Sequence, residues 1–445
     1  MTSSLPPVIV ARLAALGAAL VECVQEHRGA TLAAQEGAVL AAVRTALPGL
    51  LHAVVELATP DLAPGIAAVR RRCPGCDQLV RMQSRRSRTV QTTCGPLTLT
   101  RPWYACSACG RGFSPADTTL AVSSHARLSP ALTRWLVEVG ATTTYREAGR
   151  VLHCLTGLTV AADTIRAHTT AVGEQLAEAD AAAIAQVQAT REAAAPVDPA
   201  PGTLVVETDG AMVHYVDGWH EVKIGVVGGA QDGEVTMPSY VAARESAEQF
   251  GPRLLAEAAR RGALDVLRWE GGISGRGLAV LRPVHVVGDG APWIWNVAAE
   301  HFRERTEAVD FYHAAEHIWA VARAVYGADS DEARVGATVC IRAMRHAGGV
   351  PVRAALAAIH PPTAEAARVV RVERGYFTTN AGRMDYPALA AHGLPIGSGA
   401  VESSASQVVQ NRMKRPGQRW SARGGRAMLA LRGRLASGRP CSPAA

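Results

Sequence analysis

Three carboxylates stand at positions where an acidic side chain can meet a ligand. Asp209 follows an apolar stretch in VVETDG, Asp289 ends another in VHVVGDG, and Glu402 begins an expected helix in PIGSGAVESS. An apolar strand that ends in Asp-Gly places a carboxylate at a sheet edge, where the glycine lets a ligand approach. Each residue alone is more typical of a turn or a helix cap. Together they predict one site, with both aspartates on adjacent strands of a mixed sheet.

Carboxylate ligands of this kind suit Mg²⁺ or Mn²⁺ rather than Zn²⁺. Two such cations about 4 Å apart hold both the attacking and the leaving oxygen of a phosphoryl transfer. The expected cofactor is therefore a pair of Mg²⁺ or Mn²⁺ ions per active site. Val401, Ala405, Val408 and Val409 share one apolar helix face. Glu402 borders that face, which predicts that its side chain points towards the protein body.

Four cysteines form a second candidate site. Cys73 and Cys76 make one CxxC pair and Cys106 and Cys109 make another, with 29 residues between the pairs. Two such knuckles can place four thiolates around one Zn²⁺ ion, and the strand-like runs between them are typical of a zinc ribbon. Cys94 lies outside either pair and is not counted as a ligand. A closed site of four thiolates predicts one structural zinc rather than a catalytic one.

Positive charge is concentrated in two segments. The net charge is +7 and the pI is about 9.1. Residues 70–115 hold nine Arg against Asp77 alone, and residues 403–445 hold nine basic residues and no acid. Clustered arginine is typical of proteins that contact phosphate backbones. The candidate DNA contacts are Arg85, Arg86, Arg88, Arg166, Arg412, Lys414, Arg415 and Arg419.

The elements that must position these residues begin with helices. Residues 8–58 predict two apolar helices broken near Gly29, and residues 128–178 predict three more, with Ser129 and Thr144 as N-caps. The three helices fit a helix-turn-helix, or an ordinary packing unit, with Arg166 on the exposed face of the third helix. His168 and Thr169 are expected on that same face. The Ala-rich residues 179–202, which end in APVDPAPG, are expected to be a linker.

From Thr203 the pattern changes to strands. Three consecutive strands are expected within 203–244, then a helix over 245–263, then strands over 282–290 and 306–312 with a helix after each. Periodicity alone gives an α/β domain. The order of three strands, a helix and then alternating strands and helices is the layout of an RNase H-like domain.

Four segments together resemble the DDE transposases of bacterial insertion sequences, and the ISKra group in particular. They are ETDG, VVGDGAPWIWN, DFYHAAEHIW and PIGSGAVESSASQVVQNRMKRPGQRWS, and the resemblance covers residues 68–435. It implies an RNase H-like core with Asp209, Asp289 and Glu402 as the catalytic triad. Asp310 and His313 resemble the aspartate-x-x-histidine element of several DDE superfamilies. Val409 stands where some insertion-sequence transposases carry a catalytic lysine.

The resemblance also implies function and partners. The expected protein binds transposon inverted repeats and target DNA, cleaves a strand and transfers it. It is expected to be a homodimer or higher homo-oligomer in the cytoplasm, associated with the nucleoid and not with a membrane. The expected fold is a multidomain α+β chain. Its parts are N-terminal helices (1–67), a zinc ribbon (68–118), helix-turn-helix-like helices (119–178), a linker (179–202), the catalytic domain (203–435, with a helical insertion at about 318–392) and a tail (436–445).

Three other functions stay open from the sequence. A protein derived from a transposase could bind DNA without catalysis, and an RNase H-like nuclease would use the same triad without joining strands. Residues 313–317 read HAAEH, which matches the HxxEH pattern of a class of zinc peptidases. In that alternative His313 and His317 would bind zinc and Glu316 would act as the base.

Overall fold

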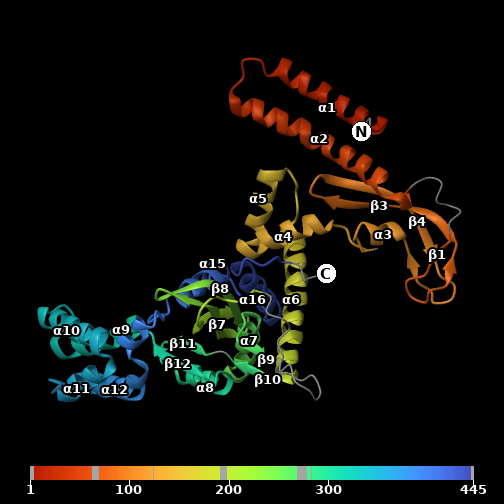
Figure 1. Cartoon of the computed structure of the whole chain (residues 1–445). Helices are drawn as coiled ribbons and strands as arrows, with labels where there is room; N and C mark the ends of the chain where they lie inside the picture. The colour runs from red at the N-terminus through yellow and green to blue at the C-terminus, as the bar shows by residue number, and fades with distance from the viewer. Residues whose placement is uncertain are drawn as a thin grey trace. The chain divides into compact units, whose positions relative to one another are not determined.

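The computed structural model describes residues 5–62, 70–123, 125–190, 198–267, 278–281 and 283–441 (Figure 1). The chain divides into two compact units, Met1–His168 and Thr169–Ala445. The division falls inside the segment predicted as three helices, because the third helix is continuous across it.

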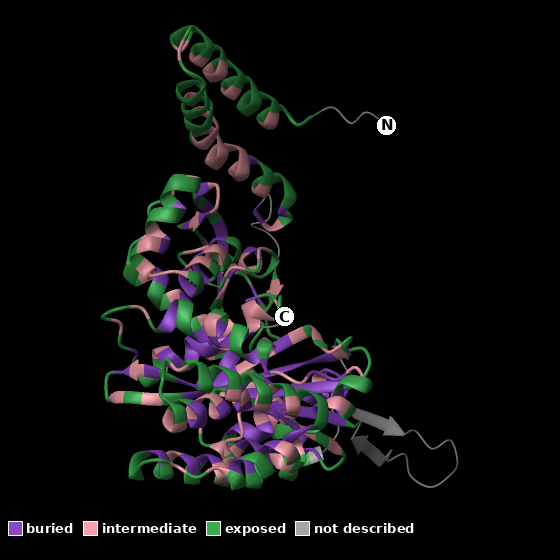
Figure 2. Cartoon of the chain, turned by 90° about the vertical axis from the view of Figure 1, so that its left-hand side faces the viewer, coloured by how far each residue is buried: buried purple, intermediate pink, exposed green. Residues whose placement is uncertain are grey.

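The first unit begins with a helical hairpin of α1 (Pro7–Glu26) and α2 (Leu32–Ala58). Gly29 has a φ of +76° in the turn, which is where the sequence predicts the break. Most of the hairpin is exposed or half-buried (Figure 2). By length and composition both helices could cross a membrane, whereas we expect the protein not to be associated with one. Core helices and signal sequences pass the same test, so localisation stays a prediction.

A cysteine-bearing β region follows. Its two longest strands, β3 (Met82–Thr92) and β4 (Gly95–Ala105), pair antiparallel, and β5 (Gly112–Phe113) joins β4. A separate pair is formed by β1 (Arg71–Arg72) and β2 (Leu79–Val80). The short elements η1 (Pro60–Leu62) and α3 (Pro115–Thr119) complete the region. Leu62, Leu97, Leu99 and Ala116 form its small core.

Three helices end the first unit: α4 (Pro130–Thr142), α5 (Tyr145–Thr156) and the start of α6 (Ala162–Thr190). The predicted caps are confirmed, since Ser129 accepts from the Leu132 N–H and Thr144 accepts from the Glu147 N–H. Leu132, Leu136, Ala148, Leu152 and Ile165 form the core of this bundle.

Two expectations for α6 are wrong. Thr169 is fully buried and His168 is half-buried, so of the predicted exposed face only Arg166 is open to solvent. Residues 179–190, expected to be linker, continue the helix, because alanine has the highest helix propensity of all residues. The remainder of that predicted linker includes residues 191–197, which lie outside the described residues.

The second unit is built on a five-stranded mixed sheet of order β12-β11-β6-β7-β8. Strands β6 (Leu204–Tyr215), β7 (Gly218–Gln231) and β8 (Glu234–Ala243) form an antiparallel meander. Strand β11 (Val284–Gly288) runs parallel to β6, and β12 (Arg305–Val309) runs parallel to β11. The predicted strands are confirmed. A hairpin of β9 (Leu264–Leu267) and β10 (Leu278–Leu281) was not expected.

Helices cover both faces of this sheet. On one face lie α7 (Ala247–Arg260) and α8 (Pro292–His301). They pack closely on glycines of the sheet: a side chain at Gly225 would meet Leu254 of α7, and a side chain at Gly288 would meet Ile294 of α8. On the other face lie α14 (Gly399–Ser404) and α16 (Ala422–Ala436). There the Tyr215 ring would clash with any side chain at Gly425. The sheet is therefore the middle of three layers.

A group of helices separates β12 from α14. Its members are α9 (Phe311–Tyr326), α10 (Asp331–Ala347), α11 (Gly349–Ala358), α12 (Ala364–Asn380), η3 (Ala381–Arg383) and α13 (Tyr386–Ala391). We predicted that a helical insertion begins near residue 318. That position lies inside α9, which is continuous from Phe311. The buried side chains of the insertion, including Phe377 and Met384, share one core with the sheet.

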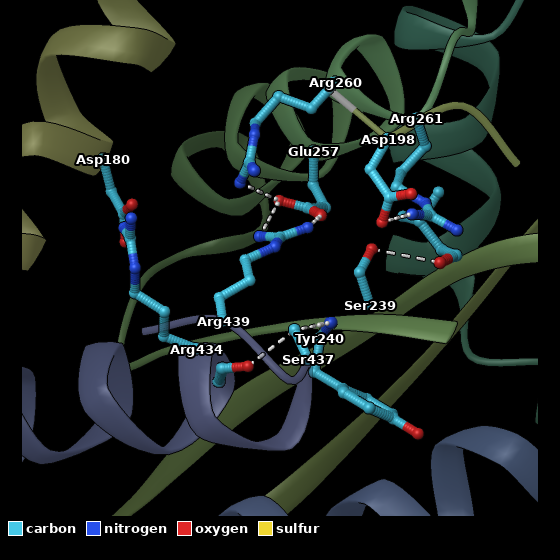
Figure 3. A network of polar contacts seen from close by, with 12 residues as sticks. Asp180, Asp198, Ser239, Tyr240, Glu257, Arg260, Arg261, Arg434, Ser437 and Arg439 are labelled. Atoms are coloured by element: carbon cyan, nitrogen blue, oxygen red, sulfur yellow. Dashed lines mark hydrogen bonds and ion pairs between the residues drawn. The ribbon is translucent and has the colours of Figure 1, made fainter. Parts of the chain in front are cut away.

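The C-terminal segment packs back onto the second unit. After α14 come a six-residue π-helix, η4 (Ala405–Gln410), and a short α15 (Asn411–Met413). Beyond α16, Arg439 makes a two-pronged ion pair with the buried Glu257 of α7, which also pairs with Arg260 at 3.4 Å (Figure 3). Ser437 Oγ accepts from the Tyr240 N–H at 2.9 Å. These contacts tie the chain end to α7 and β8.

Candidate functional site

Two of the three candidate carboxylates lie on neighbouring strands. Asp289 directly follows β11, as predicted, but Asp209 lies in the middle of β6, which continues to Tyr215 and is the central strand of the sheet, so the predicted strand end at this Asp-Gly is wrong. In the parallel pair of β6 and β11, Thr208 is the Cα partner of Gly288. Asp209 follows Thr208 and Asp289 follows Gly288, and both aspartates are half-buried. The expectation of adjacent strands in one mixed sheet is therefore confirmed. The Asp209 carboxylate accepts from the Gly210 N–H at 2.6 Å, and that of Asp289 accepts from the Ala291 N–H at 2.8 Å.

Glu402 comes to the same region from α14, which packs on β6 and β7. The apolar face predicted for this helix is confirmed, since Val401, Ala405, Val408 and Val409 are all buried. The last three of these residues lie in the π-helical turn that follows α14. Glu402 itself is exposed, so our expectation that it points towards the protein body is wrong. It stands at the solvent side of the site.

The three carboxylates share one electrostatic environment. Burial raises the pKa of Asp209, the Gly210 N–H lowers it, and the negative charges of Asp289 and Glu402 raise it again. A positively charged His313 lowers it. Crowded carboxylates that raise one another's pKa fit a divalent cation, since their oxygens are hard ligands. In the described part of the chain, however, only the four cysteines bring their ligand atoms within 4.8 Å of one another.

A fourth carboxylate, Glu207, lies beneath these three. It is 1% exposed on β6 and faces the same side of the sheet as Asp209, two residues later. Its Oε2 atom accepts from the Val401 N–H at 2.8 Å. Burial raises the pKa of Glu207 to about 8, although the N–H groups of Val401 and Ala400 lower it. Glu207 was not among the residues predicted for the site, although an acid inside the apolar run LVVETDG was a signal for it.

Asp310, at the end of β12, is fully buried and holds two segments together. One oxygen accepts from the His313 N–H at 2.8 Å and so caps α9. The other accepts from the Ser398 N–H at 2.5 Å and from the Ser398 hydroxyl. The Ser398 Oγ atom also lies 3.4 Å from Glu402 Oε1. Asp310 therefore connects the start of α9 to the start of the helix that carries Glu402.

Two histidines lie next to the site on α9. His313 Nε2 and His317 Nε2 are 3.3 Å apart, and His317 Nδ1 lies 2.6 Å from Glu373 Oε2 on α12. The Tyr376 ring stacks on His317 with centroids 3.8 Å apart. The nearest acid to His313 Nδ1 is Glu316, at 3.6 Å. The sequence marked His317 only through the HxxEH pattern and His313 also through the aspartate-x-x-histidine element, and nothing local in it pointed to Glu373 or Tyr376.

The four cysteines of the first unit converge. The Sγ atoms of Cys73 and Cys109 are 3.5 Å apart, as are those of Cys76 and Cys106, and all four lie within 4.8 Å of one another. Tetrahedral Zn–S bonds of about 2.3 Å place sulfurs about 3.8 Å apart. The cluster can therefore hold a metal ion such as zinc. Cys94 lies outside the cluster, as predicted.

The two knuckles have the same backbone geometry. The Asp77 N–H donates to the Cys73 carbonyl, and the Gly110 N–H donates to the Cys106 carbonyl, each at 2.9 Å. Asp77 and Gly110 both have a positive φ, of 59° and 72°. Each knuckle thus ends in a left-handed residue directly after its second cysteine, which turns the chain around the thiols.

The thiols influence one another's ionisation. The backbone N–H of Cys109 is the main cause that lowers the pKa of Cys106 to about 7. At Cys76 the Gln78 backbone lowers the pKa, but hydrogen bonds with the neighbouring thiols and burial raise it to about 12. Four crowded thiols cannot all carry a negative charge unless a cation compensates it, which is what a bound zinc ion would do.

The arginines of the first unit that were predicted to contact DNA differ in their exposure to solvent. Arg86 and Arg166 are exposed; Arg86 lies over the Trp103 ring at 4.6 Å and Arg166 pairs with Asp163. Arg85 is exposed but donates to the Leu62 and Thr100 carbonyls. Arg88 is half-buried and donates to the Ser123 carbonyl, so it holds a loop instead of facing solvent.

In the C-terminal segment, Lys414 and Arg419 are exposed and Arg415 is half-buried. Arg412 is fully buried, which corrects its assignment as a DNA contact. Its guanidinium lies 5.0 Å from the centroid of the Trp420 ring, and the Gln418 amide is placed to accept from its Nη1 atom at 2.6 Å. Arg412 therefore fixes the fold of this segment, and its neighbours carry the exposed charge.

These features define a mixed α+β protein with a helical N-terminus, a sheet-containing core and a cysteine cluster that can hold a metal. Residues 77–226 match the model of an uncharacterised protein family, UPF0236. The matched range begins at Asp77, directly after the first pair of cysteines, and ends within β7, so it includes Cys106, Cys109 and Asp209 but not Cys73 or Cys76. No curated protein matches the chain.

Proposed function

We propose that this protein is a DDE transposase of the kind found in bacterial insertion sequences, similar to the ISKra group. It would bind the ends of its transposon, cleave a DNA strand and transfer that strand to a target duplex. The observation that carries the proposal is that Asp209 on β6 and Asp289 after β11 lie on paired parallel strands, and that the charges of Asp289 and of Glu402 on α14 both raise the pKa of Asp209.

The sheet supports an RNase H-like core. Three antiparallel strands are followed by two that run parallel to the first, and α7 and α8 connect β8 to β11 and β11 to β12. This order is the one the sequence predicted for that fold. Because β11 pairs in parallel with β6 and ends opposite Thr208, the residue that follows β11, Asp289, comes next to Asp209 within β6.

The three carboxylates would hold two Mg²⁺ or Mn²⁺ ions, which neutralise charge on the scissile phosphate and orient the attacking oxygen. Asp209 and Asp289 would bind from the sheet, and Glu402 would bind from the solvent side, where the DNA must arrive. Lys414, Arg415 and Arg419 follow on the same polypeptide segment and would contact phosphates. The cysteine cluster would bind structural zinc and, with Arg86, form a DNA-binding ribbon.

The same proposal places the protein in the cytoplasm with the nucleoid, as a homodimer or higher oligomer on paired transposon ends. Cleavage and joining assays on authentic end DNA test it. The wild type is expected to cut in Mg²⁺ or Mn²⁺ but not in EDTA, and to join the freed 3′-hydroxyl to a second duplex. Asp209→Asn, Asp289→Asn and Glu402→Gln are each expected to slow cleavage about 10³-fold or more while DNA binding persists.

The outcomes separate the alternatives. If the wild type binds ends but neither cuts nor joins, the protein is a DNA-binding module without catalysis. Cutting without joining would indicate an RNase H-like nuclease. Cleavage that survives Glu402→Gln would remove Glu402 from the triad. A zinc peptidase at His313 and His317 would be indicated by peptide hydrolysis that Glu316→Gln abolishes.

A further inference from the structure

Two buried carboxylates converge on the short segment that leads into Glu402. Asp310 accepts from the Ser398 N–H at 2.5 Å, and Glu207 accepts from the Val401 N–H at 2.8 Å. The Ala400 N–H also points to Glu207. Ser398 is the N-cap of α14, so these are the N–H groups that a helix leaves without partners in its first turn. No side chain of α14 itself caps them.

These N–H groups need partners from elsewhere because the first turn of a helix offers them none. The α14 helix continues without a break into η4 and α15, so this turn begins one helical segment that runs from Gly399 to Met413. The preceding segment is fixed by two further bonds to the sheet region. The Phe311 N–H donates to the Ile396 carbonyl at 2.9 Å, and His285 Nε2 lies 2.8 Å from the Pro395 carbonyl.

Glu207 also connects α14 to the strand that carries Asp209. The two side chains lie on one face of β6, two residues apart, which corresponds to about 7 Å along a strand. Val401, which Glu207 holds, directly precedes Glu402. A shift of α14 relative to β6 would therefore change the distance between Glu402 and Asp209, the two acids that must face one cation.

We propose that Glu207 is a positioning residue for the active site: it fixes α14 against β6 and so sets Glu402 at the distance from Asp209 that cation binding requires. Asp310 does the same at Ser398. The inference rests on the proposed function, since it gives the roles of two acids that do not themselves bind the cations. Both are shielded from solvent, as expected of supports that act through the backbone.

The test compares Glu207→Gln with Glu207→Ala. Glutamine keeps a carbonyl oxygen that can accept from the Val401 N–H, whereas alanine leaves that N–H without a partner. Binding of Mn²⁺ alone, without DNA, is measured by water proton relaxation, and cleavage of end DNA is measured separately. Glu207→Ala is expected to weaken Mn²⁺ binding and slow cleavage by about 10- to 100-fold each, while Glu207→Gln stays within a few-fold of wild type.

Ala400→Pro is a second variant, which removes an N–H that points to Glu207 and leaves the carboxylate in place. Proline is tolerated in the first turn of a helix, so this chain is expected to fold even if Glu207→Ala does not. It should also weaken Mn²⁺ binding, by a smaller factor.

Glu257→Ala is the matched control for destabilisation. Glu257 is a buried, paired carboxylate in α7, on the opposite face of the sheet. Its loss is expected to lower the melting temperature without changing Mn²⁺ affinity. The inference is overturned if Glu207→Ala, folded, binds Mn²⁺ and cleaves DNA like wild type while Glu402→Gln does not. The inference is also overturned if Glu257→Ala weakens Mn²⁺ binding as much as Glu207→Ala does. If wild type neither binds Mn²⁺ nor cleaves, the proposed function fails first.

Discussion

The Tyr376 hydroxyl, on α12 of the helical insertion, donates a hydrogen bond to the backbone carbonyl of Asp289 at 3.1 Å. The turn that it holds is tight, because Gly290 has a φ of +103° and a side chain there would meet the Tyr376 ring at 2.8 Å. The same ring stacks on His317. The insertion thus contributes directly to the placement of one catalytic candidate.

Removal of this hydroxyl is expected to loosen the Asp289 turn. Tyr376→Phe keeps the stacking on His317 and deletes one partly buried hydrogen bond, which should lower the free energy of unfolding by about 1 kcal/mol. Cleavage should slow more than stability alone explains, because the aspartate that follows β11 is less well fixed. Urea unfolding and cleavage rates measure the two effects. Tyr326→Phe is the control, because Tyr326 is an exposed residue of α9, and it should change neither the stability nor the cleavage rate.

The exposed and buried basic residues of the C-terminal segment should behave differently. Lys414→Ala and Arg419→Ala each remove an exposed charge and should leave stability unchanged. If each side chain contacts a phosphate, each substitution should reduce the slope of log K against log salt by about 1. Fluorescence anisotropy with end DNA at several salt concentrations measures that slope.

Arg412→Ala should lower the melting temperature instead, because it removes a buried guanidinium that packs on Trp420. Its effect on the salt slope should be small once the folded fraction is taken into account. An Arg412→Ala protein with wild-type stability and a reduced salt slope would restore Arg412 as a DNA contact and contradict the buried arrangement.

Local signals in the sequence predicted most of the helices and strands and several of their ends. Asp289-Gly290 marked the end of a buried strand, and Ser129 and Thr144 marked helix starts, because both signals depend on neighbours within a few residues. Asp209-Gly210 did not mark a strand end, since β6 continues to Tyr215. The order of strands and helices then limited the possible sheets, so the adjacency of Asp209 and Asp289 followed from topology.

Features that depend on distant partners were not predictable. The burial of Arg412 depends on Trp420 and Gln418, and the positive charge alone suggested a surface position. Glu207 looked like part of a strand, and its role appears only once Val401, 194 residues further on, lies against it. The extension of α6 to Thr190 was missed because alanine-rich sequence was given to a linker despite its helix propensity.

The cysteine cluster predicts a specific response to loss of one thiol. Cys76→Ser should reduce bound zinc from about one ion per chain towards zero, because a structural site needs all four ligands. Much of a small ribbon's folding energy comes from the metal, so proteolysis should become faster within residues 71–113. Metal analysis by mass spectrometry and limited trypsin digestion measure these effects.

Cys94→Ser is the matched control, because Cys94 lies between the knuckles but outside the cluster. It should keep full zinc content. Retention of one zinc ion in Cys76→Ser, or its loss in Cys94→Ser, would show that the metal ligands are not the four that converge in the structure.

The ion pair of Arg439 with Glu257 should make stability depend on pH. Burial raises the pKa of Glu257, but the ion pairs with Arg439 and Arg260 lower it by a larger amount. The pKa of the folded protein's Glu257 is therefore below its ordinary value. A carboxyl group whose pKa is lower folded than unfolded stabilises the protein above its unfolded pKa of about 4.5. That contribution is lost as the pH falls through the folded pKa.

Arg439→Ala removes the closest partner and leaves the buried carboxylate with Arg260 as its remaining ion-pair partner. Breaking a buried pair in this way should cost about 3 kcal/mol at pH 7. The difference from wild type should shrink as the pH falls below about 4.5, and it should vanish below the folded pKa of Glu257, where this residue is protonated in both folded proteins and needs no partner. Urea unfolding of both proteins between pH 3 and pH 8, an experimental range of about five units around that pKa, measures the difference. A constant difference across the range would show that Arg439 stabilises the chain end through packing and not through its charge.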